Sequence, residues 1–560
     1  MTSTSFSRGQ RIIGAATHYV DNQPPWRVDV NEFAVNTPLV QAVDAFGAGW
    51  ARDELDEAGS HVGSLDFQRD AVLANTHTPV AHAHDRWGFR LDEVEYDPSY
   101  HRIISAAIAR GAHTSAWADP RPGASVARAA MFMLFAQGEP GHACPVSMTH
   151  AAVASIEASP RLADEWLPRL YSRQYDPRLR PPPEKTSALI GMAMTEKQGG
   201  SDVRAGTTRG VYMGGSTYQL SGHKWFCSAP MSDGFLVLAQ TTRSGKEEGL
   251  TCLFVPRLLA HGSRNVFRIQ RLKDKLGNRS NASAEIELDG TVGVVIGEPG
   301  RGVRAIIEMV QRTRLDCVLG SAAGMRQAVA EATWHARGRE AFGAPLVDQP
   351  AMTAVLADLA LESEAAMLTG MRLAQLFEAS ATESEIALRR LATPVAKYWV
   401  TKRGPHHAYE ALECLGGNGY TEQFPLARRY REQPVMAIWE GSGNVIALDV
   451  LRALTRDPDS AEAFAGELQH TRGASTLLDS HVQRTMSLLA SLADAPEEAQ
   501  TQARRVTEGL ALALQASLML QHAPSLDAET FIAARLGEDR GAEYGVLPRG
   551  TDAASIVARH

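Results

Sequence analysis

The amino-acid sequence predicts an α+β protein in which helical blocks flank a central β-domain. Two observations support this class. Segments with the apolar period of a helix lie toward both ends of the chain, whereas short apolar runs bounded by Gly, Ser and Pro fill its middle. In addition, no G-x-G-x-x-G sequence follows a predicted strand. Helices and strands are therefore segregated along the chain, which argues against a parallel sheet built from alternating β and α units.

We expect four domains in the 560 residues, because domains average about 150 residues. A mostly helical domain covers 1–186, a strand domain covers 187–296, a helical bundle covers 297–456 and a helical extension covers 457–560.

The first domain is predicted to be helical mainly over 37–175. The stretch 126–136 contains no Gly or Pro and one charge, which is typical of a buried helix. A basic, Pro-rich loop at 176–185 separates this domain from the next.

The second domain is predicted from short apolar runs, the last of which alternates with polar residues. These runs are 189–194, 218–220, 235–240, 250–255 and 284–288.

The helical period returns at Gly302, and one helix is expected to continue to about Arg339. Further helices follow to about Arg456, with a break at 416–420. The Ala- and Leu-rich extension beyond them also has a helical pattern, with a poorly patterned end.

Composition excludes several classes of protein. A net charge of −8 provides no general attraction to nucleic acid or anionic membrane. We expect no membrane span, because no run of about 18 apolar residues exists. The polar stretch 1–26 does not resemble a signal peptide, so a cytoplasmic location is expected. The five cysteines include no C-x-x-C pair, so neither a disulfide framework nor a metal site is predicted.

The segment 438–444 carries the strongest sign of chemistry. Glu440 follows Trp439 and precedes Gly441-Ser442-Gly443. A carboxylate held against apolar surface can act as a general base near neutral pH, and glycines let a backbone approach the phosphates of a ligand. An isolated glutamate is more often a surface ion-pair partner, and that alternative remains open on this segment alone.

Two earlier segments could contact a heteroaromatic ring. In 192–202, Thr195 and Ser201 offer hydroxyls beside two glycines, although an ordinary hairpin turn explains the same pattern. In 222–228, Trp225 and Phe226 could form a flat wall, although paired aromatics are more often part of a core.

Together these segments resemble the acyl-CoA dehydrogenase flavoprotein superfamily over about residues 120–455. The run 339–343 with Gln349 is similar to the family's Arg-x-x-Phe-Gly segment. The residues at 416–417 and 440–442 match in order and spacing.

The chain resembles most closely the AidB-like branch, named for a protein of the alkylation response. This likeness rests on 194–203, 271–283, the Trp-Glu-Gly-Ser-Gly-Asn run at 439–444 and the extension past 456. It implies an acyl-CoA dehydrogenase-like fold with an antiparallel central β-domain.

The resemblance implies that FAD lies between the strand domain and the helices that follow it. It also implies a homotetramer in which Arg339, Phe342 and Gln349 reach a neighbour's FAD, and Gly416 and Gly417 meet its pyrophosphate. The full set of implied cofactor contacts is Met194, Thr195, Gly200, Ser201, Phe226, Cys227, Ser228, Arg339, Phe342, Gln349, Gly416, Gly417, Ile438, Gly441, Ser442 and Asn444. At Cys227 the branch more often has an aromatic residue, so we expect a looser wall there.

Glu440 resembles the family's catalytic base, which removes the proton α to a thioester carbonyl. Trp439, Arg431 and Arg452 are implied to narrow the acyl cavity, although both arginines could equally be structural ion-pair partners. The resemblance implies an FAD-dependent oxidoreductase with low activity on isovaleryl-CoA-like thioesters and a role in the adaptive response to DNA alkylation. The alternative is a metabolic dehydrogenase of short or branched acyl-CoA.

Double-stranded DNA is a further partner that the resemblance implies, but composition argues against strong binding. Residues 451–560 contain ten arginines, no lysine and fifteen acidic residues, a net charge of about −5. Local clusters at 173–185, 428–431 and 504–505 are each more often solvated faces than phosphate sites.

Overall fold

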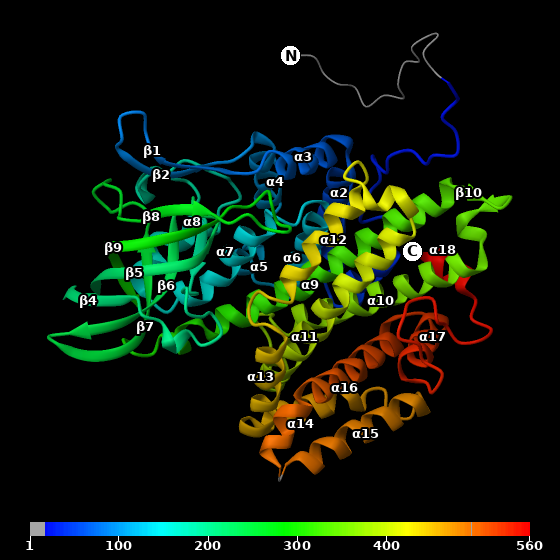
Figure 1. Cartoon of the computed structure of the whole chain (residues 1–560). Coiled ribbons are helices and arrows are strands. Elements are labelled where there is room, and N and C mark those ends of the chain that lie inside the picture. The colour runs from blue at the N-terminus through cyan, green and yellow to red at the C-terminus, as the bar shows by residue number, and fades with distance from the viewer. Residues whose placement is uncertain (1–16, 494) are drawn as a thin grey trace.

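A mostly antiparallel β-domain projects from one end of a large helical body in the computed structural model, which describes residues 17–493 and 495–560 (Figure 1). The predicted α+β class is confirmed. Of the polar stretch 1–26, for which no signal peptide is expected, residues 1–16 lie outside the described part.

The N-terminal domain is mainly helical. Its helices are α1 (Thr37–Ala45), α2 (Arg52–Gly63), α3 (Leu65–Thr76), α4 (Pro98–Ala109), α5 (Ser115–Ala118), α6 (Ala124–Gly138), α7 (Ala143–Ile156) and α8 (Pro160–Leu170). Helix α6 is buried almost throughout, as its sequence with a single charge predicts, and that charge, Arg128, pairs with Asp316. A hairpin of β1 (Val80–His84) and β2 (Arg90–Glu95) interrupts the helices, which the sequence analysis did not predict. Its turn is closed by the Asp85 carboxylate, which accepts the N–H groups of Trp87 and Phe89 at 2.9 Å each.

The central domain is a seven-stranded sheet. Its strands are β3 (Ile190–Ala193), β4 (Arg209–Gly214), β5 (Thr217–Ser228), β6 (Gly234–Arg243), β7 (Lys246–Pro256), β8 (Arg268–Leu272) and β9 (Ser283–Ile296). The order is β3-β6-β4-β5-β9-β7, β8 pairs with β9, and β7 pairs back to β6. Only β3–β6 and β4–β6 are parallel pairs. Each of the five predicted apolar runs lies on one of these strands.

The helical bundle follows the sheet. It contains α9 (Gly302–Gly338), α10 (Pro350–Gln375), α11 (Glu383–Glu413), α12 (Pro425–Met436) and α13 (Gly443–Arg456). Helix α9 runs from the β-domain to the small hairpin of β10 (Glu340–Ala341) and β11 (Ala344–Pro345) at the opposite end of the helical body (Figure 1). The predicted break at 416–420 is a 3-10 turn, Gly416–Tyr420.

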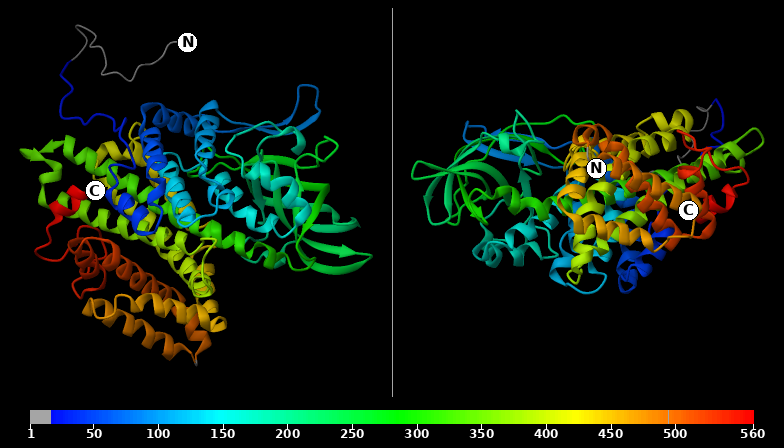
Figure 2. Two further views of the ribbon diagram at one scale, coloured as in Figure 1. Left: turned by 180° about the vertical axis from the view of Figure 1, so that it is seen from behind. Right: turned by 90° about the horizontal axis from the view of Figure 1, so that it is seen from below.

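The C-terminal extension lies against one side of the bundle (Figure 2). Its helices are α14 (Pro458–Gln469), α15 (Thr476–Leu492), α16 (Pro496–His522), α17 (Ser525–Leu536) and α18 (Ala553–Arg559). Across the described residues, every helix is too short or too polar to cross a membrane.

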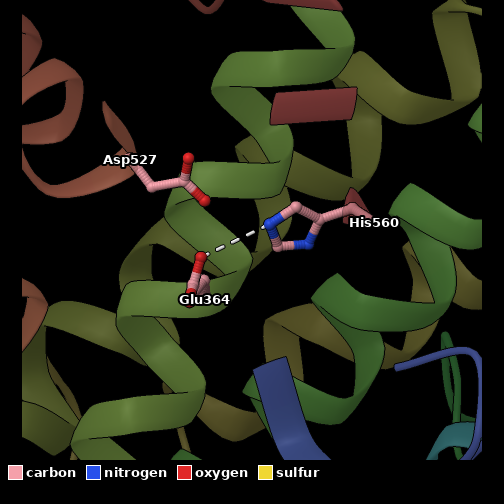
Figure 3. A group of neighbouring side chains, drawn as sticks. All are labelled: Glu364, Asp527 and His560. Atoms are coloured by element: carbon pink, nitrogen blue, oxygen red, sulfur yellow. Dashed lines mark ion pairs between the residues drawn. The ribbon is translucent and has the colours of Figure 1, made fainter. Parts of the chain in front are cut away.

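Helix α18 returns to α10 and ends in a cluster of charged side chains (Figure 3). The Arg559 guanidinium lies 2.5 Å from the Glu364 carboxylate and 2.7 Å from that of Asp527. The His560 imidazole lies 3.3 Å from Glu364. The arginine thus pairs with two neighbouring buried acids and joins α10, α17 and α18.

Candidate active site around Glu440

Glu440 lies in a strained turn between α12 and α13. Its φ is +57°, in the left-handed region that non-glycine residues avoid at a cost of about 1–2 kcal/mol. Gly441 follows with φ +109°, and a Cβ there would lie 3.0 Å from Ile446 Cδ1. Only glycine satisfies both the backbone angle and the space at position 441.

The carbonyls of this turn are held by two cations from different helices. Arg314 Nε on α9 donates to the Glu440 carbonyl at 3.2 Å, and Lys397 Nζ on α11 donates to the Gly441 carbonyl at 2.5 Å. The sequence analysis singled out neither cation. The available signal was a charged residue within a helix face that is otherwise apolar.

The carboxyl of Glu440 has the electrostatics of a general base. Glu440 is partly exposed, yet the surrounding protein raises the pKa of its carboxyl by desolvation. A hydrogen bond from Thr313 and the charges of Arg314 and Lys397 oppose that rise in pKa. A carboxylate whose pKa moves toward neutrality is a stronger proton acceptor when it is ionised.

An apolar wall lies beside this carboxyl, at the junction of three domains. Trp439 and Met192 of β3 both pack against a buried cluster of Cys144 and Met148 of α7 and Ala229 just after β5. Burial raises the pKa of the Cys144 thiol to about 11, with Glu440 among the charges that raise it further. The structure therefore brings Trp439 and Glu440 to a site that residues near positions 144 and 192 also line.

The predicted loop at 194–202 lies against β5. The Thr195 carbonyl accepts the Trp225 N–H at 2.8 Å, and a Cβ at Gly200 would lie 2.8 Å from Thr195 Oγ1. The buried Glu196 carboxylate anchors the loop by pairing with Lys224 Nζ at 2.8 Å. That ion pair was not predicted. Met194 and Gly200 are partly buried at the start and middle of the loop, and Ser201 is exposed.

The end of β5 presents alternate residues to opposite sides. Phe226 is 46% exposed, and the Ser228 hydroxyl lies 3.1 Å from that of Ser283. Cys227 is fully buried, so it can reach a ligand only through its backbone. Its thiol forms part of the core of the sheet and leaves the exposed wall unchanged.

A second set of predicted residues gathers far from Glu440. Arg339, Gly416 and Gly417 line one cavity of about 380 Å³ together with His335 and Asn418. Along α9, the 25 residues from Thr313 to Gly338 span about 37 Å at about 1.5 Å per residue. Within one chain, this cavity and the Glu440 turn are therefore separate sites.

The hairpin beside that cavity projects freely. Phe342 is 100% exposed at its tip, with φ +53°. Gln349 donates to the Ala341 carbonyl at 3.0 Å, and Arg339 donates to the Asn22 carbonyl at 2.5 Å.

The two arginines predicted near the base form ion pairs elsewhere. Arg431 pairs with Glu422 at 2.5 Å, and Arg452 lies 3.3 Å from Asp449. Asp449 also binds Arg314 at 2.6 Å, so Arg452 is connected to the Glu440 turn only through that aspartate.

The other residues of the segment are open to solvent or to the extension. Ile438 is 64% exposed, and Ser442 and Asn444 are also exposed. Asn444 Oδ1 accepts a hydrogen bond from Arg504 Nε of α16 at 2.8 Å. The extension therefore contacts the first turn of α13.

Comparison with known proteins matches three family profiles along the chain. They are the adaptive response protein AidB N-terminal domain over 22–177, the acyl-CoA dehydrogenase middle domain over 191–291 and the acyl-CoA dehydrogenase C-terminal domain over 300–455.

Individual relatives show the same family relationship. AidB of Escherichia coli (strain K12) is 42% identical over 90% of this chain and 92% of its own length. Caenorhabditis elegans ACDH-11, solved in complex with C11-CoA, is 26% identical and superposes with a TM-score of 0.86 over 98% of this chain and 97% of its own. An acyl-CoA dehydrogenase from Bacillus anthracis, solved with FAD, is 18% identical and shares the fold, with a TM-score of 0.65 over 79% of this chain and 81% of its own. The chain belongs to the AidB branch of the acyl-CoA dehydrogenase family.

Proposed function

We propose that this chain is an FAD-dependent, acyl-CoA dehydrogenase-type flavoprotein in which Glu440 is the catalytic base and thioester oxidation is slow. The observation that carries the proposal is the Glu440 turn, where a carboxyl of raised pKa adjoins an apolar wall. Bound FAD would supply the hydride acceptor, and the protein would supply the position of the base.

The residues around β5 fit a flavin. Phe226 leaves nearly half of its surface uncovered, which suits an aromatic partner ring. Thr195 and Ser201 lie in a loop fixed by the Glu196–Lys224 pair, so their hydroxyls are placed before any ligand binds. In this proposal Met194, Thr195, Gly200, Ser201, Phe226 and Ser228 hold the ring, the Cys227 backbone adjoins it, and Ile438, Gly441, Ser442 and Asn444 border it from the bundle.

The second cavity supports a shared cofactor. The cavity lined by Arg339, Gly416 and Gly417 adjoins the C-terminal end of α9, about 37 Å along that helix from Thr313, which interacts with Glu440. The Phe342 side chain is 100% exposed among the described residues. We propose that this cavity and hairpin contact the FAD of a neighbouring subunit in a homotetramer, with Gln349 supporting the hairpin.

Slow turnover follows from the packing of Trp439. Its ring packs against the buried cluster that contains Met148, so a long acyl chain entering this region would have to displace it. That Arg452 and Arg431 also narrow this region stays part of the proposal, and their ion pairs with Asp449 and Glu422 hold them on α13 and α12.

A role in the adaptive response to DNA alkylation is the cellular function that we propose, supported by the match of 22–177 to the AidB N-terminal domain. Duplex DNA is the corresponding partner. The acidic balance of 451–560 predicts weak binding that salt abolishes. The competing function is metabolic oxidation of a short or branched acyl-CoA.

One pair of measurements separates these functions. Purified protein is mixed anaerobically with isovaleryl-CoA while flavin absorbance is followed, and duplex DNA is titrated at several salt concentrations. We expect FAD to copurify, flavin reduction to be slow and DNA binding to fall steeply with salt. Rapid flavin bleaching without DNA binding would support the metabolic function instead.

A further inference from the structure

The Glu440 turn has an unusual support. The consecutive backbone carbonyls of Glu440 and Gly441 lie in a turn outside the helices. Each accepts a hydrogen bond from a cationic side chain. Hydrogen bonds to charged donors are about twice as strong as neutral ones. The two donors come from α9 and α11, so the turn is fixed to both long helices of the bundle.

Of the two donors, Lys397 gives the stronger evidence of a specific role. It is 1% exposed, and among the described residues it forms no ion pair with a carboxylate. Burying an ammonium without a counter-ion is costly, so such a group is retained where its charge or hydrogen bond is needed. The acidic groups that interact with it are the Cys317 thiol and the Glu440 carboxyl.

Arg314 differs because it has its own counter-ion. Its guanidinium lies 2.6 Å from Asp449, which also binds Arg390 at 3.0 Å. The Asp449 carboxylate therefore offsets the desolvation cost of the Arg314 charge. The Nε–H of Arg314 donates to the Glu440 carbonyl.

We propose that Lys397 and Arg314 are positioning residues that hold the left-handed Glu440 turn, and that Lys397 is also the internal counter-charge of the Glu440 carboxylate. This inference rests on the proposed role of Glu440 as a base. Neither side chain touches the reacting atoms in this scheme. They act through the backbone and the charge of Glu440.

The groups that face Glu440 define how its titration should respond. They are Thr313, Arg314 and Cys317 on α9, Lys397 on α11 and Cys144 on α7. The two thiols stay neutral at physiological pH because burial raises the pKa of each to 11 or above. Lys397 and Arg314 are therefore the charges that favour ionised Glu440.

Two substitutions at Lys397 separate its two roles. Lys397→Met removes both the hydrogen bond and the charge with little change in volume. Lys397→Gln keeps an N–H donor for the Gly441 carbonyl but removes the charge. Lys185→Met removes another buried ammonium, paired with Asp233 at 2.5 Å, and controls for general loss of stability.

The measurements are amide hydrogen exchange of peptides covering 437–446, FAD content, and the pH profile of α-proton exchange of isovaleryl-CoA in D₂O. In Lys397→Met we expect exchange of the turn to rise at least tenfold and kcat/KM to fall about tenfold to hundredfold, with FAD retained. In Lys397→Gln the turn should stay protected, while the acid limb of the profile moves to higher pH. Lys185→Met should change neither.

The proposal is overturned if Lys397→Met leaves both the turn and the pH profile as in the parent protein. If the parent protein exchanges no α-proton at all, the role of Glu440 as a base fails. Amide exchange in the turn then still decides whether Lys397 and Arg314 hold it, with Arg314→Met as the second variant.

Discussion

The Glu440 turn and the Arg339–Gly417 cavity are built in opposite ways. The turn is held by side chains of two helices, α9 and α11, and the Trp439 ring next to Glu440 packs against a buried apolar cluster. The cavity lies at the far end of α9, and the hairpin beside it carries a fully exposed Phe342. In the proposed function, a single chain thus supplies a reaction centre around Glu440 at one end and an open contact surface for a neighbouring subunit at the other.

The largest effect is expected at the Glu440 turn. Glu440→Gln removes the base while conserving shape, so thioester turnover should fall by about 10²–10⁴-fold. Flavin absorbance of the purified variant should remain. Loss of the flavin together with activity would show that Glu440 is structural and would remove the contrast between the two ends.

At the open end we expect a change in cofactor binding and assembly. Phe342→Asp should weaken FAD binding or subunit association by about tenfold or more, because a hot-spot aromatic contributes about 2 kcal/mol to an interface. The thermal stability of the separate subunit should not change, since this ring is 100% exposed in its own chain. Light scattering and FAD titration measure the two effects. Unchanged assembly and FAD affinity would mean that this hairpin contacts no partner.

The pH dependence of thioester turnover should follow the titration of Glu440, whereas cofactor binding at the cavity should not depend on it. Burial raises the pKa of Glu440, and a base acts only when it is ionised. Thioester turnover should therefore be full above that raised pKa and fall with protonation as pH decreases through it. FAD content measured over the same pH range should stay constant. A limb at the ordinary glutamate pKa would show that the carboxyl is solvated.

The smallest effect is expected at Cys227. Cys227→Ala should cost about 1 kcal/mol through a small cavity in the sheet, because the thiol is fully buried. The flavin spectrum should not change, since the side chain is turned away from the exposed wall. A spectral shift in this variant, measured next to its thermal melting curve, would place the thiol against the ring after all.

Local sequence patterns predicted most of the fold. The apolar runs at 235–240 and 250–255 became β6 and β7, and the periodicity from Gly302 became α9, because burial of one face or of a whole strand is written in the local sequence. The β1–β2 hairpin was not predicted, although the alternation of its side chains and the turn at Asp85–Phe89 are visible in the sequence.

The candidate site was predictable only in part. Glu440 and Trp439 are adjacent in the sequence, so their neighbourhood could be anticipated. Arg314 and Lys397 lie 126 and 44 residues from the carbonyls that they hold. Only tertiary packing of α9 and α11 brings them to the turn, and a charged residue on an apolar helix face does not reveal which group it contacts. Arg452 and Arg431 show the reverse, because their ion pairs are with neighbours close in the sequence.

The Arg559 contact has a practical consequence for handling the protein. Clipping the last few residues would leave Glu364 and Asp527 facing each other in the interior without a counter-charge, and Asp527 already has a pKa raised to about 6. In such a product the carboxyl pair should bind a proton more tightly, so that the extension stays docked only when one of the two carboxyls is protonated. The irregular stretch 537–552 before α18 is fastened as well, because Tyr544 is buried and the Gly545 N–H donates to the Asp358 carboxylate at 2.9 Å. An affinity tag therefore belongs at the amino terminus.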